Sequence, residues 1–379
     1  MSELAASYGE LQLVEQPAIE LLMDLGWEHR NLFAERYGAD ASDSPGSEGR
    51  ESEHQVILTR RLLTALRRLN PRLPEDAYAQ AIEQLTRDRS KQVAVNANRE
   101  FYRLIKDGVS VTVTDEHGGQ TTERLRVIDW TLPSNNTFLL TSQMWVAGDM
   151  YRRRCDLIAF VNGLPLVFIE LKKPSVPLRS AFDDNLRDYR GQSVPQLFHP
   201  NAFIVLSNGS DTRIGTLTSA WEHFFDWKRV LSEDEVVDPA DKVSLPRALR
   251  GLLEPARLLD YIENFTLFEE GKGGLIKKTA KNHQFLGVNK AIARLVEATE
   301  AQKAESLGFR LRGNDEQKPV NDEQKQGHDE QGRKRLGVFW HTQGSGKSLS
   351  MVFFTQKILR TLPGTWSFVV VTDREELDD

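Results

Sequence analysis

The chain has 379 residues, of which 39% are hydrophobic and 27% are charged, a composition typical of a soluble globular protein with two or three domains. It has no apolar run near the roughly 20 residues that a membrane-spanning helix needs, and its first residues lack the blocks of a secretory signal. The single cysteine, Cys155, excludes an internal disulfide framework and favours the reducing cytoplasm. The net charge of −6 excludes a uniformly basic surface, so any surface for phosphates must be a local patch.

The predicted elements change from helices to strands over the first 230 residues. Apolar residues at helical spacing predict helices over residues 10–26, 52–69 and 76–89, whereas residues 40–51 are polar and predict a solvated loop. From Gly108 the pattern alternates, with a turn at Gly118-Gly119, and this predicts strands. Further strand-like segments lie at 124–129, 137–145, 155–161, 164–171 and 202–207. The order predicts a mixed α/β domain with a central sheet that ends near residue 230.

The second part of the chain has a different organisation. Residues 231–270 predict a helical connector, and a third region extends over 271–379. Within it, Asn314-Asp315-Glu316-Gln317-Lys318 recurs as Asn321-Asp322-Glu323-Gln324-Lys325. The repeat has almost no apolar residue to form a coiled-coil seam, so residues 310–333 predict a flexible loop.

A glycine-rich loop lies between a short apolar strand, residues 338–340, and a predicted helix over 349–360. Strand, loop, Gly-Lys-Ser and helix is the context of a phosphate-binding loop, although His341 stands where the general pattern has its first glycine. Its N–H groups would bind phosphates, Lys347 would neutralise them and Ser348 would ligate Mg²⁺. A chance glycine-rich turn is the alternative. After the helix, residues 366–371 predict a second strand, which is buried. The expected nucleotide-binding residues are Thr342, Gly344, Ser345, Gly346, Lys347 and Ser348.

A hairpin carries the other group of chemically capable residues. Asp156 begins an apolar run, Asn162-Gly163 turns the chain, and the returning run ends in Glu170-Leu171-Lys172. Two close carboxylates can hold a divalent metal against a phosphate, and a lysine can orient water or stabilise developing charge. The alternative is a chance arrangement in a charged protein, but charges that interrupt buried strands cost free energy unless they have a function.

The spacing of these residues makes a structural prediction. Glu170 and Lys172 share one face of a strand because they are two residues apart. A strict two-residue turn would pair Asp156 with Ile169 and put Glu170 on the opposite face. A common site therefore requires an odd loop or a β-bulge in this hairpin.

Basic residues surround the hairpin and predict the local positive patch. On the following helix, Asn185 and Tyr189 are candidates to contact DNA or support the site, and a solvated helix face is an equal alternative for both. The basic residues are Arg152, Arg153, Arg154, Lys173, Arg179, Arg187 and Arg190.

The run from Arg154 to Pro174 resembles the nuclease core of type I restriction enzyme R subunits. The phosphate loop and residues 371–379 resemble the first motifs of the superfamily 2 motor of the same family, so the resemblance spans nearly the whole chain. It implies a restriction-endonuclease-like PD-(D/E)xK nuclease domain at 1–230, the connector at 231–270, and part of a RecA-like helicase lobe at 271–379. The implied activity is that of a Mg²⁺-dependent endonuclease and ATP-dependent DNA translocase.

The resemblance also implies roles for single residues. Asp156, Glu170 and Lys172 would be the cleavage residues, with Asp156, Glu170 and Ser348 as metal ligands, and Gln284 would read the adenine of ATP. Asn185 stands where the family has a glutamine, with Tyr189 kept. Glu15 could complete the metal site, although a plain surface carboxylate is favoured.

The implied partners are double-stranded DNA and the modification (methyltransferase) and specificity subunits. Because the chain stops just after the second predicted motor strand, we expect a fragment that by itself lacks ATPase and translocase activity and whose last region is poorly stabilised. The alternatives are a docking module that does not cut, and a nuclease-helicase that resects DNA ends.

Overall fold

The computed structural model describes residues 11–38, 46–114, 117–236, 243–271, 273–311, 338–339, 342 and 344–371. By its contacts the chain divides into two compact units, Met1–Val230 with Glu235–Lys281, and Leu231–Asp234 with Asn282–Asp379. The first unit therefore contains most of the segment that the sequence suggests as a connector.

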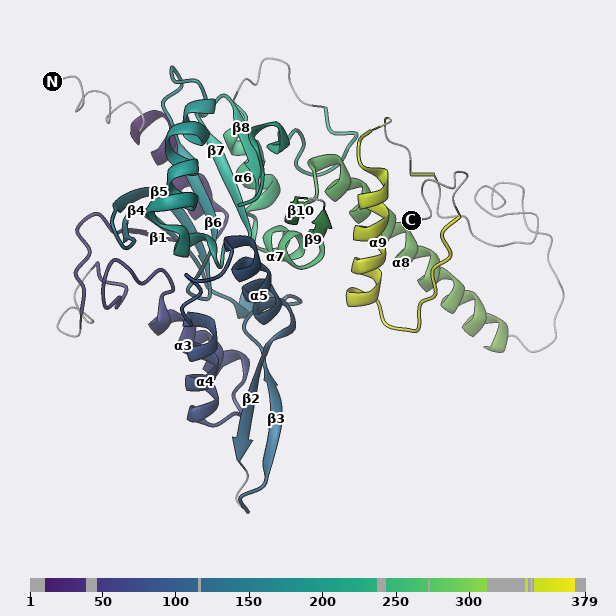
Figure 1. Cartoon of the computed structure of the whole chain (residues 1–379). Helices are drawn as coiled ribbons and strands as arrows, with labels where there is room; N and C mark the ends of the chain where they lie inside the picture. The colour runs from purple at the N-terminus through teal and green to yellow at the C-terminus, as the bar shows by residue number, and fades with distance from the viewer. Residues whose placement is uncertain are drawn as a thin grey trace. The chain divides into compact units, whose positions relative to one another are not determined.

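A six-stranded sheet forms the centre of the first unit, in the order β1-β4-β5-β6-β7-β8 (Figure 1). The pairs β1–β4 and β6–β7 are parallel, and the other neighbours are antiparallel. The predicted mixed α/β domain with a central sheet is confirmed. The strands are β1 (Glu28–Asn31), β4 (Phe138–Ala147), β5 (Arg152–Val161), β6 (Leu164–Leu171), β7 (Phe203–Ser207) and β8 (Thr212–Gly215).

The central strands of this sheet are buried on both faces. Every residue of β6 and β7 is buried, which explains why their sequences are continuous apolar runs rather than alternating ones. The two edge strands, β1 and β8, escape the sequence prediction because each has four residues and no apolar pattern. The helical segments that complete this region are η1 (Leu11–Glu15), α2 (Gln16–Asp24), η3 (Pro133–Asn135), η4 (Ala181–Leu186), η5 (Tyr189–Ser193), η6 (Pro195–Phe198) and η7 (Trp221–His223).

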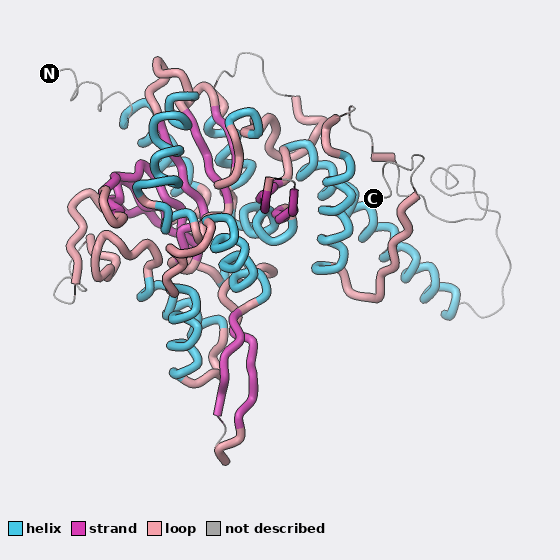
Figure 2. The backbone as a smooth tube through the Cα atoms, in the orientation of Figure 1, coloured by secondary structure: helices cyan, strands magenta, loops and turns pink. Residues whose placement is uncertain are grey.

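A hairpin extends away from the central sheet, and two helices lie beside it (Figures 1 and 2). Its strands are β2 (Val109–Thr114) and β3 (Gln120–Leu125), so the strand expected at 124–129 begins and ends earlier. α4 (Glu75–Thr86) packs on β2, where Gln80 exchanges side-chain hydrogen bonds with the backbone of Thr112. α3 (Thr59–Leu69) begins seven residues later than expected from 52, and α5 (Ala94–Asp107) was not predicted.

The predicted connector is only partly helical. It contains α6 (Leu245–Leu252) and α7 (Pro255–Asn264), but the chain then forms β9 (Thr266–Gly271), which pairs with β10 (Gly274–Thr279). Both helices begin with proline within their first two positions, where no intrahelical N–H bond is lost. The buried Tyr261 on α7 donates its hydroxyl to the Ala280 carbonyl and so binds this small sheet to the helix.

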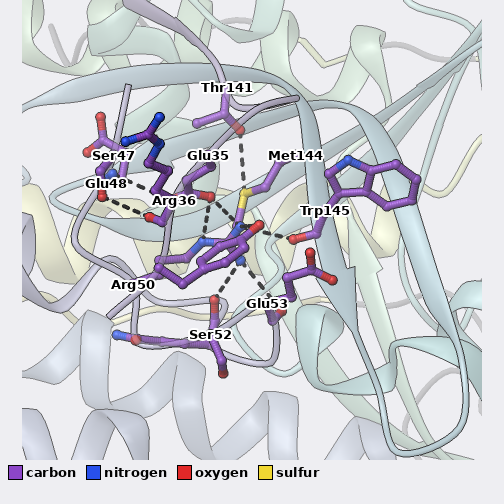
Figure 3. A network of polar contacts seen from close by, with 12 residues as sticks. Glu35, Arg36, Ser47, Glu48, Arg50, Ser52, Glu53, Thr141, Met144 and Trp145 are labelled. Carbon is purple, nitrogen blue, oxygen red and sulfur yellow. Dashed lines mark hydrogen bonds and ion pairs between the residues drawn. The ribbon is translucent and has the colours of Figure 1, made fainter. Parts of the chain in front are cut away.

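The loop predicted to be solvated over 40–51 has a buried end. Arg50 is 0% exposed, and its guanidinium donates to the carboxylate of Glu35 and to the backbone carbonyls of Gln55 and Trp145 (Figure 3). The prediction of a solvated loop is wrong here, because the ion pair and carbonyl acceptors satisfy the charge that composition alone would leave in water. Residues 39–45 of that loop lie outside the described part.

The described part of the second unit consists of two helices and irregular segments. They are α8 (Asn282–Leu311), which was not predicted, and α9 (Lys347–Thr361), and the two pack together. The strand predicted at 366–371 is wrong, because these residues form no strand and Val369 and Val371 are each 88% exposed. An apolar segment becomes a strand only beside a partner that takes its backbone hydrogen bonds, and the described residues of this unit offer none.

Several predictions of the second unit fall on undescribed residues. Val338 and Phe339 are not in a strand, and Trp340 lies outside the described part. The repeat at 314–331 also lies outside it. Among the helices that the structure describes, none combines the length and hydrophobicity of a membrane span.

Candidate functional site

The hairpin of β5 and β6 has the bulge that the carboxylate spacing required. Asn162 and Gly163 form the two-residue turn, with φ of +52° and +83°. Near the turn Phe160 pairs with Pro165, but beyond a register shift Ala159 pairs with Val167 and Leu157 with Ile169. The extra residue on β6 continues the register so that Asp156 stands opposite Glu170, on one face of the sheet. The prediction of an odd loop or a bulge is confirmed, in the form of a bulge.

Side-chain contacts link the three predicted cleavage residues. The Leu171 N–H, between Glu170 and Lys172, donates to Asp156 Oδ2 at 2.8 Å. Lys172 Nζ donates to Glu170 Oε1 at 2.8 Å. Glu170 is 2% exposed and Asp156 is half-buried, so the group spans from the interior to the surface. The two carboxylates and the ammonium therefore form one polar cluster at the end of the buried apolar runs of β5 and β6.

Tyr189 also packs against this cluster. Its ring makes an edge contact with Phe168, with centroids 5.9 Å apart, and Phe168 shares a strand face with Glu170. Burial first, and then the negative charge of Glu170, raises the pKa of the Tyr189 phenol. Asn185 donates to the Tyr189 hydroxyl at 3.4 Å. Of the two alternatives left by the sequence, the structure places Tyr189 in the interior rather than on a solvated face.

Glu15 is not a surface carboxylate, and that expectation is wrong. It is 3% exposed, and both of its oxygens accept hydrogen bonds from Gln143 Nε2, at 3.0 and 2.8 Å. Gln143 lies on β4 between the pairs Ser142–Leu157 and Met144–Cys155, which is the register position facing Asp156. Its φ of +57° is uncommon for a residue with a side chain. Glu15 is in the interior because the helical segment that carries it is packed against the rest of the unit. The local sequence alone does not predict this.

In the second unit, the glycine loop leads directly into α9. Gly344 and Gly346 have φ of +77° and +85°, the left-handed region that glycine adopts without strain. Gly346 caps α9, and Lys347 and Ser348 are exposed at the first two positions of this 15-residue helix. Thr342 accepts a hydrogen bond from the Ser345 N–H, whereas His341 and Gln343 lie outside the described residues. Such a helix N-terminus presents N–H groups to an anion.

Two side chains from α8 hold this loop. Gln284 is 1% exposed and donates to the Gly346 carbonyl at 2.9 Å. His283 Nε2 lies 3.1 Å from the Ser345 carbonyl. The structure therefore brings Gln284 to the phosphate loop, and its expected reading of adenine stays a prediction.

Comparison with known proteins decides the family. The model of the type I restriction enzyme R protein N terminus matches residues 7–223, more than half of the chain. The chain belongs to this family. A second family model, SWI2/SNF2 ATPase, matches residues 283–379.

Relatives within the type I restriction family span the same region. The chain is 35% identical, over 96% of its length, to the type I restriction enzyme HindI endonuclease subunit of Haemophilus influenzae. It is 28% identical over its whole length to a putative type I restriction enzyme endonuclease subunit, MjaIXP, of Methanocaldococcus jannaschii. The chain spans about a third of the length of these two relatives, 32% and 34%.

Part of the predicted basic patch is used inside the fold of this family member. Arg190 donates to the Leu217 and Ser219 carbonyls, and Arg153 pairs with Asp188 at 2.8 Å. Arg152 and Arg154 are exposed on β5, the strand that carries Asp156. Some of the arginines beside the cluster therefore stabilise the fold, and others face solvent.

The donor atoms suit a hard divalent cation. Asp156 and Glu170 supply carboxylate oxygens from adjacent strands, and Mg²⁺ is commonly held by one or two carboxylates together with water and substrate phosphates. Among the described residues, no group of three or more His, Cys, Asp or Glu side chains could hold a metal ion. A metal at this site would therefore take its remaining ligands from water or from a bound phosphate.

Proposed function

We propose that the first unit is a PD-(D/E)xK nuclease domain that cuts double-stranded DNA with Mg²⁺, using Asp156, Glu170 and Lys172. The observation that carries this proposal is the β-bulge, which brings Asp156 opposite Glu170. A bulge in a buried hairpin interrupts the ladder, and such features occur next to active sites, where they re-aim a side chain. Membership of the restriction enzyme family supports the same function.

The residues of the cluster have separable roles in this proposal. The Leu171 N–H orients the Asp156 carboxylate toward the edge of β6, and Glu170 holds the Lys172 ammonium in place. Lys172, which is partly exposed, orients the attacking water and stabilises negative charge on the phosphate. Tyr189 is a neutral phenol, its pKa is raised further by burial and by the charge of Glu170, and it packs beside the cluster. A bound Mg²⁺ would polarise the scissile phosphate.

We further propose that the second unit is part of a RecA-like superfamily 2 lobe that binds ATP for DNA translocation. Gly344 and Gly346 allow the backbone to approach phosphates, Lys347 neutralises them, and Ser348 is placed to ligate the Mg²⁺ of the nucleotide. Thr342 and Ser345 form the turn before the helix, and Gln284 holds it from α8. The match to a SWI2/SNF2 ATPase model supports this part.

The longer protein would act in the cytoplasm with modification and specificity subunits, and it would cut DNA that lacks the modification. This assignment rests on the curated relatives, which are named as type I restriction endonuclease subunits. The translocase and ATPase activities are proposed for that assembly rather than for the present chain.

Metal binding tests the nuclease proposal. We would titrate Mg²⁺ and Mn²⁺ into the chain by calorimetry, and repeat this with Asp156→Asn and Glu170→Gln. Each substitution should abolish binding because it removes one of two carboxylate ligands. Asp183→Asn, at a partly exposed carboxylate that pairs with Arg179, is the matched control and should bind as the wild type does.

Binding that neither substitution changes, or no binding by a folded wild-type chain, would reject the site. The alternative function is then docking on the methyltransferase core without cutting, because docking has no use for a metal between these strands. A nuclease that resects DNA ends would keep metal binding but would cut without the partner subunits.

A further inference from the structure

Aromatic and arginine side chains gather around the strand that carries Asp156. We call this set the cation–aromatic patch, and it consists of Phe33, Trp145, Arg152 and Arg154. Trp145 on β4 pairs directly with Arg154 on β5, so both side chains lie on one face of the sheet. Phe33 follows β1, the strand on the other side of β4.

The members of the patch are stacked on one another. Arg152 Cζ lies 3.9 Å from the centre of the Trp145 ring. Arg154 Cζ lies 5.9 Å from the same centre and 5.7 Å from that of Phe33. The rings of Phe33 and Trp145 are 6.4 Å apart. These are cation–π distances, and they hold the two guanidinium groups against aromatic faces.

The patch is open to solvent. Phe33 is 54% exposed, Trp145 is half-buried, and both arginines are exposed. Arg152 pairs with Glu53 at 2.6 Å, whereas Arg154 forms no ion pair within the part of the chain that the structure describes. Single exposed aromatic residues are ordinary, but a cluster that combines them with arginines marks a binding surface.

The patch is continuous with the carboxylate cluster. Arg152, Arg154 and Asp156 are each two residues apart on β5 and so share a face. At a rise of about 3.3 Å per residue, the two arginines lie roughly 7 and 13 Å along the strand from Asp156. That is the distance at which the nucleotides next to a scissile phosphate would lie.

The chemistry of the patch favours unpaired bases. Arginines contact phosphates in any nucleic acid, but aromatic faces gain stacking energy only from bases whose faces are accessible. Duplex DNA keeps its bases stacked on one another, so it would leave the two rings unused. A guanidinium plane is also a surface on which an unpaired base can stack.

We propose that the cation–aromatic patch binds a single-stranded segment of DNA beside the scissile phosphate. The proposal deepens the nuclease function and rests on it. It means that the strand to be cut is separated from its complement over the nucleotides that flank Asp156.

The test measures binding of the whole chain to fluorescent oligonucleotides by anisotropy, without divalent metal so that no cleavage occurs. A 20-nucleotide oligo(dT) is compared with a duplex of the same length. We expect tighter binding of oligo(dT), and Phe33→Ala should weaken it by roughly 5- to 150-fold, the range for loss of one stacked base. Arg154→Ala should make the slope of log K against log salt concentration shallower by about 0.7, because one phosphate contact is lost.

Matched variants separate stacking from general effects. Leu132→Ala removes a side chain that is 54% exposed, as Phe33 is. Arg67→Ala removes an arginine paired with Glu75 at 2.6 Å, as Arg152 is with Glu53, but without an aromatic ring in contact. Both controls should keep wild-type affinity. Phe33→Leu keeps an apolar side chain. It should leave the melting temperature unchanged but still lose oligo(dT) binding.

Equal affinity for duplex and single strand, unchanged by the patch variants, would overturn the proposal. Absence of any oligonucleotide binding would also overturn it and would leave a protein partner as the occupant. Metal binding at Asp156 and Glu170 is measured without DNA, so failure of the patch and failure of the nuclease site give different results.

Discussion

The carboxylate cluster and the phosphate loop are held in different ways. Asp156 and Glu170 are positioned by the register of a buried hairpin, and a single extra residue in β6 decides whether they share a face. Gly346 and Lys347 are positioned by backbone dihedral angles at the start of α9, with Gln284 reaching the loop from α8. The sheet site depends on the pairing register of two adjacent strands, whereas the loop site depends on local glycines and on a few side-chain contacts from α8.

This contrast predicts that substitutions under the sheet cost more stability than those around the loop. The largest effect is expected for Glu35→Gln, because it leaves the fully buried Arg50 without its counter-ion. Breaking a buried pair typically costs about 3–5 kcal/mol. Chemical denaturation would measure the loss, and Glu75→Gln, in the exposed pair with Arg67, should change stability little. Equal effects of the two substitutions would contradict the distinction.

The next effect is expected at the turn of the hairpin formed by β5 and β6. Gly163 has φ of +83°, and a Cβ there would lie 2.5 Å from the Leu58 carbonyl and 2.9 Å from the Leu62 nitrogen. Backbone atoms cannot move aside cheaply, so Gly163→Ala should cost about 2–4 kcal/mol from strain and overpacking. The free energy of unfolding, measured by urea titration, would check this value. A loss below about 1 kcal/mol would show that the turn and α3 can separate.

A matched glycine in the phosphate loop should be more tolerant. At Gly346, with φ of +85°, a Cβ would meet the side-chain nitrogen of Gln284 at 2.7 Å, and a side chain can rotate away. Gly346→Ala should therefore cost only the conformational strain of about 1–2 kcal/mol. We would compare its unfolding with that of the Gly163→Ala variant. A loss as large as that at Gly163 would mean that the loop is as firmly held as the hairpin.

The last prediction concerns the buried Lys277, and it has the smallest expected change in stability for each pH unit. Lys277 is fully buried, its ammonium donates to Asn98 Oδ1 at 2.9 Å and to the Asn201 carbonyl at 2.7 Å, and burial lowers its pKa to about 7. Between pH 7 and the ordinary lysine pKa of 10.5, the unfolded chain binds a proton that the folded chain does not. Stability should therefore fall as the pH is lowered through this window, by up to about 1.4 kcal/mol per pH unit, and change no further below it.

The Lys277→Met variant should lose this dependence on pH. Unfolding by urea at several pH values from 7 to 10 would give the slope for each variant. Lys347→Met removes an exposed lysine of the phosphate loop and should leave the slope as it is in the wild type. The same slope in Lys277→Met and wild type would assign the pH dependence to other groups.

Local patterns predicted much of both candidate sites. The turn at Asn162-Gly163, the glycine loop before α9 and the apolar runs of β5 and β6 all follow from short segments. An irregularity in this hairpin could also be predicted, because Asp156 and Glu170 share a face only if the hairpin has an odd loop or a bulge. The failures include the isolated run at 366–371, which has no strand to pair with among the described residues, and the short polar strand β1.

The sequence by itself determined the turn, the glycine loop and the strands that carry the carboxylates, because these depend on dihedral preferences and on hydrophobic patterns over a few residues. Only the tertiary structure decided that Glu15, Arg50 and Lys277 are buried and that Tyr189 packs beside Glu170. It also decided that Trp145 and Phe33 meet the arginines of β5. Burial of a charge depends on the partners that distant segments bring to it, and no local pattern contains those partners.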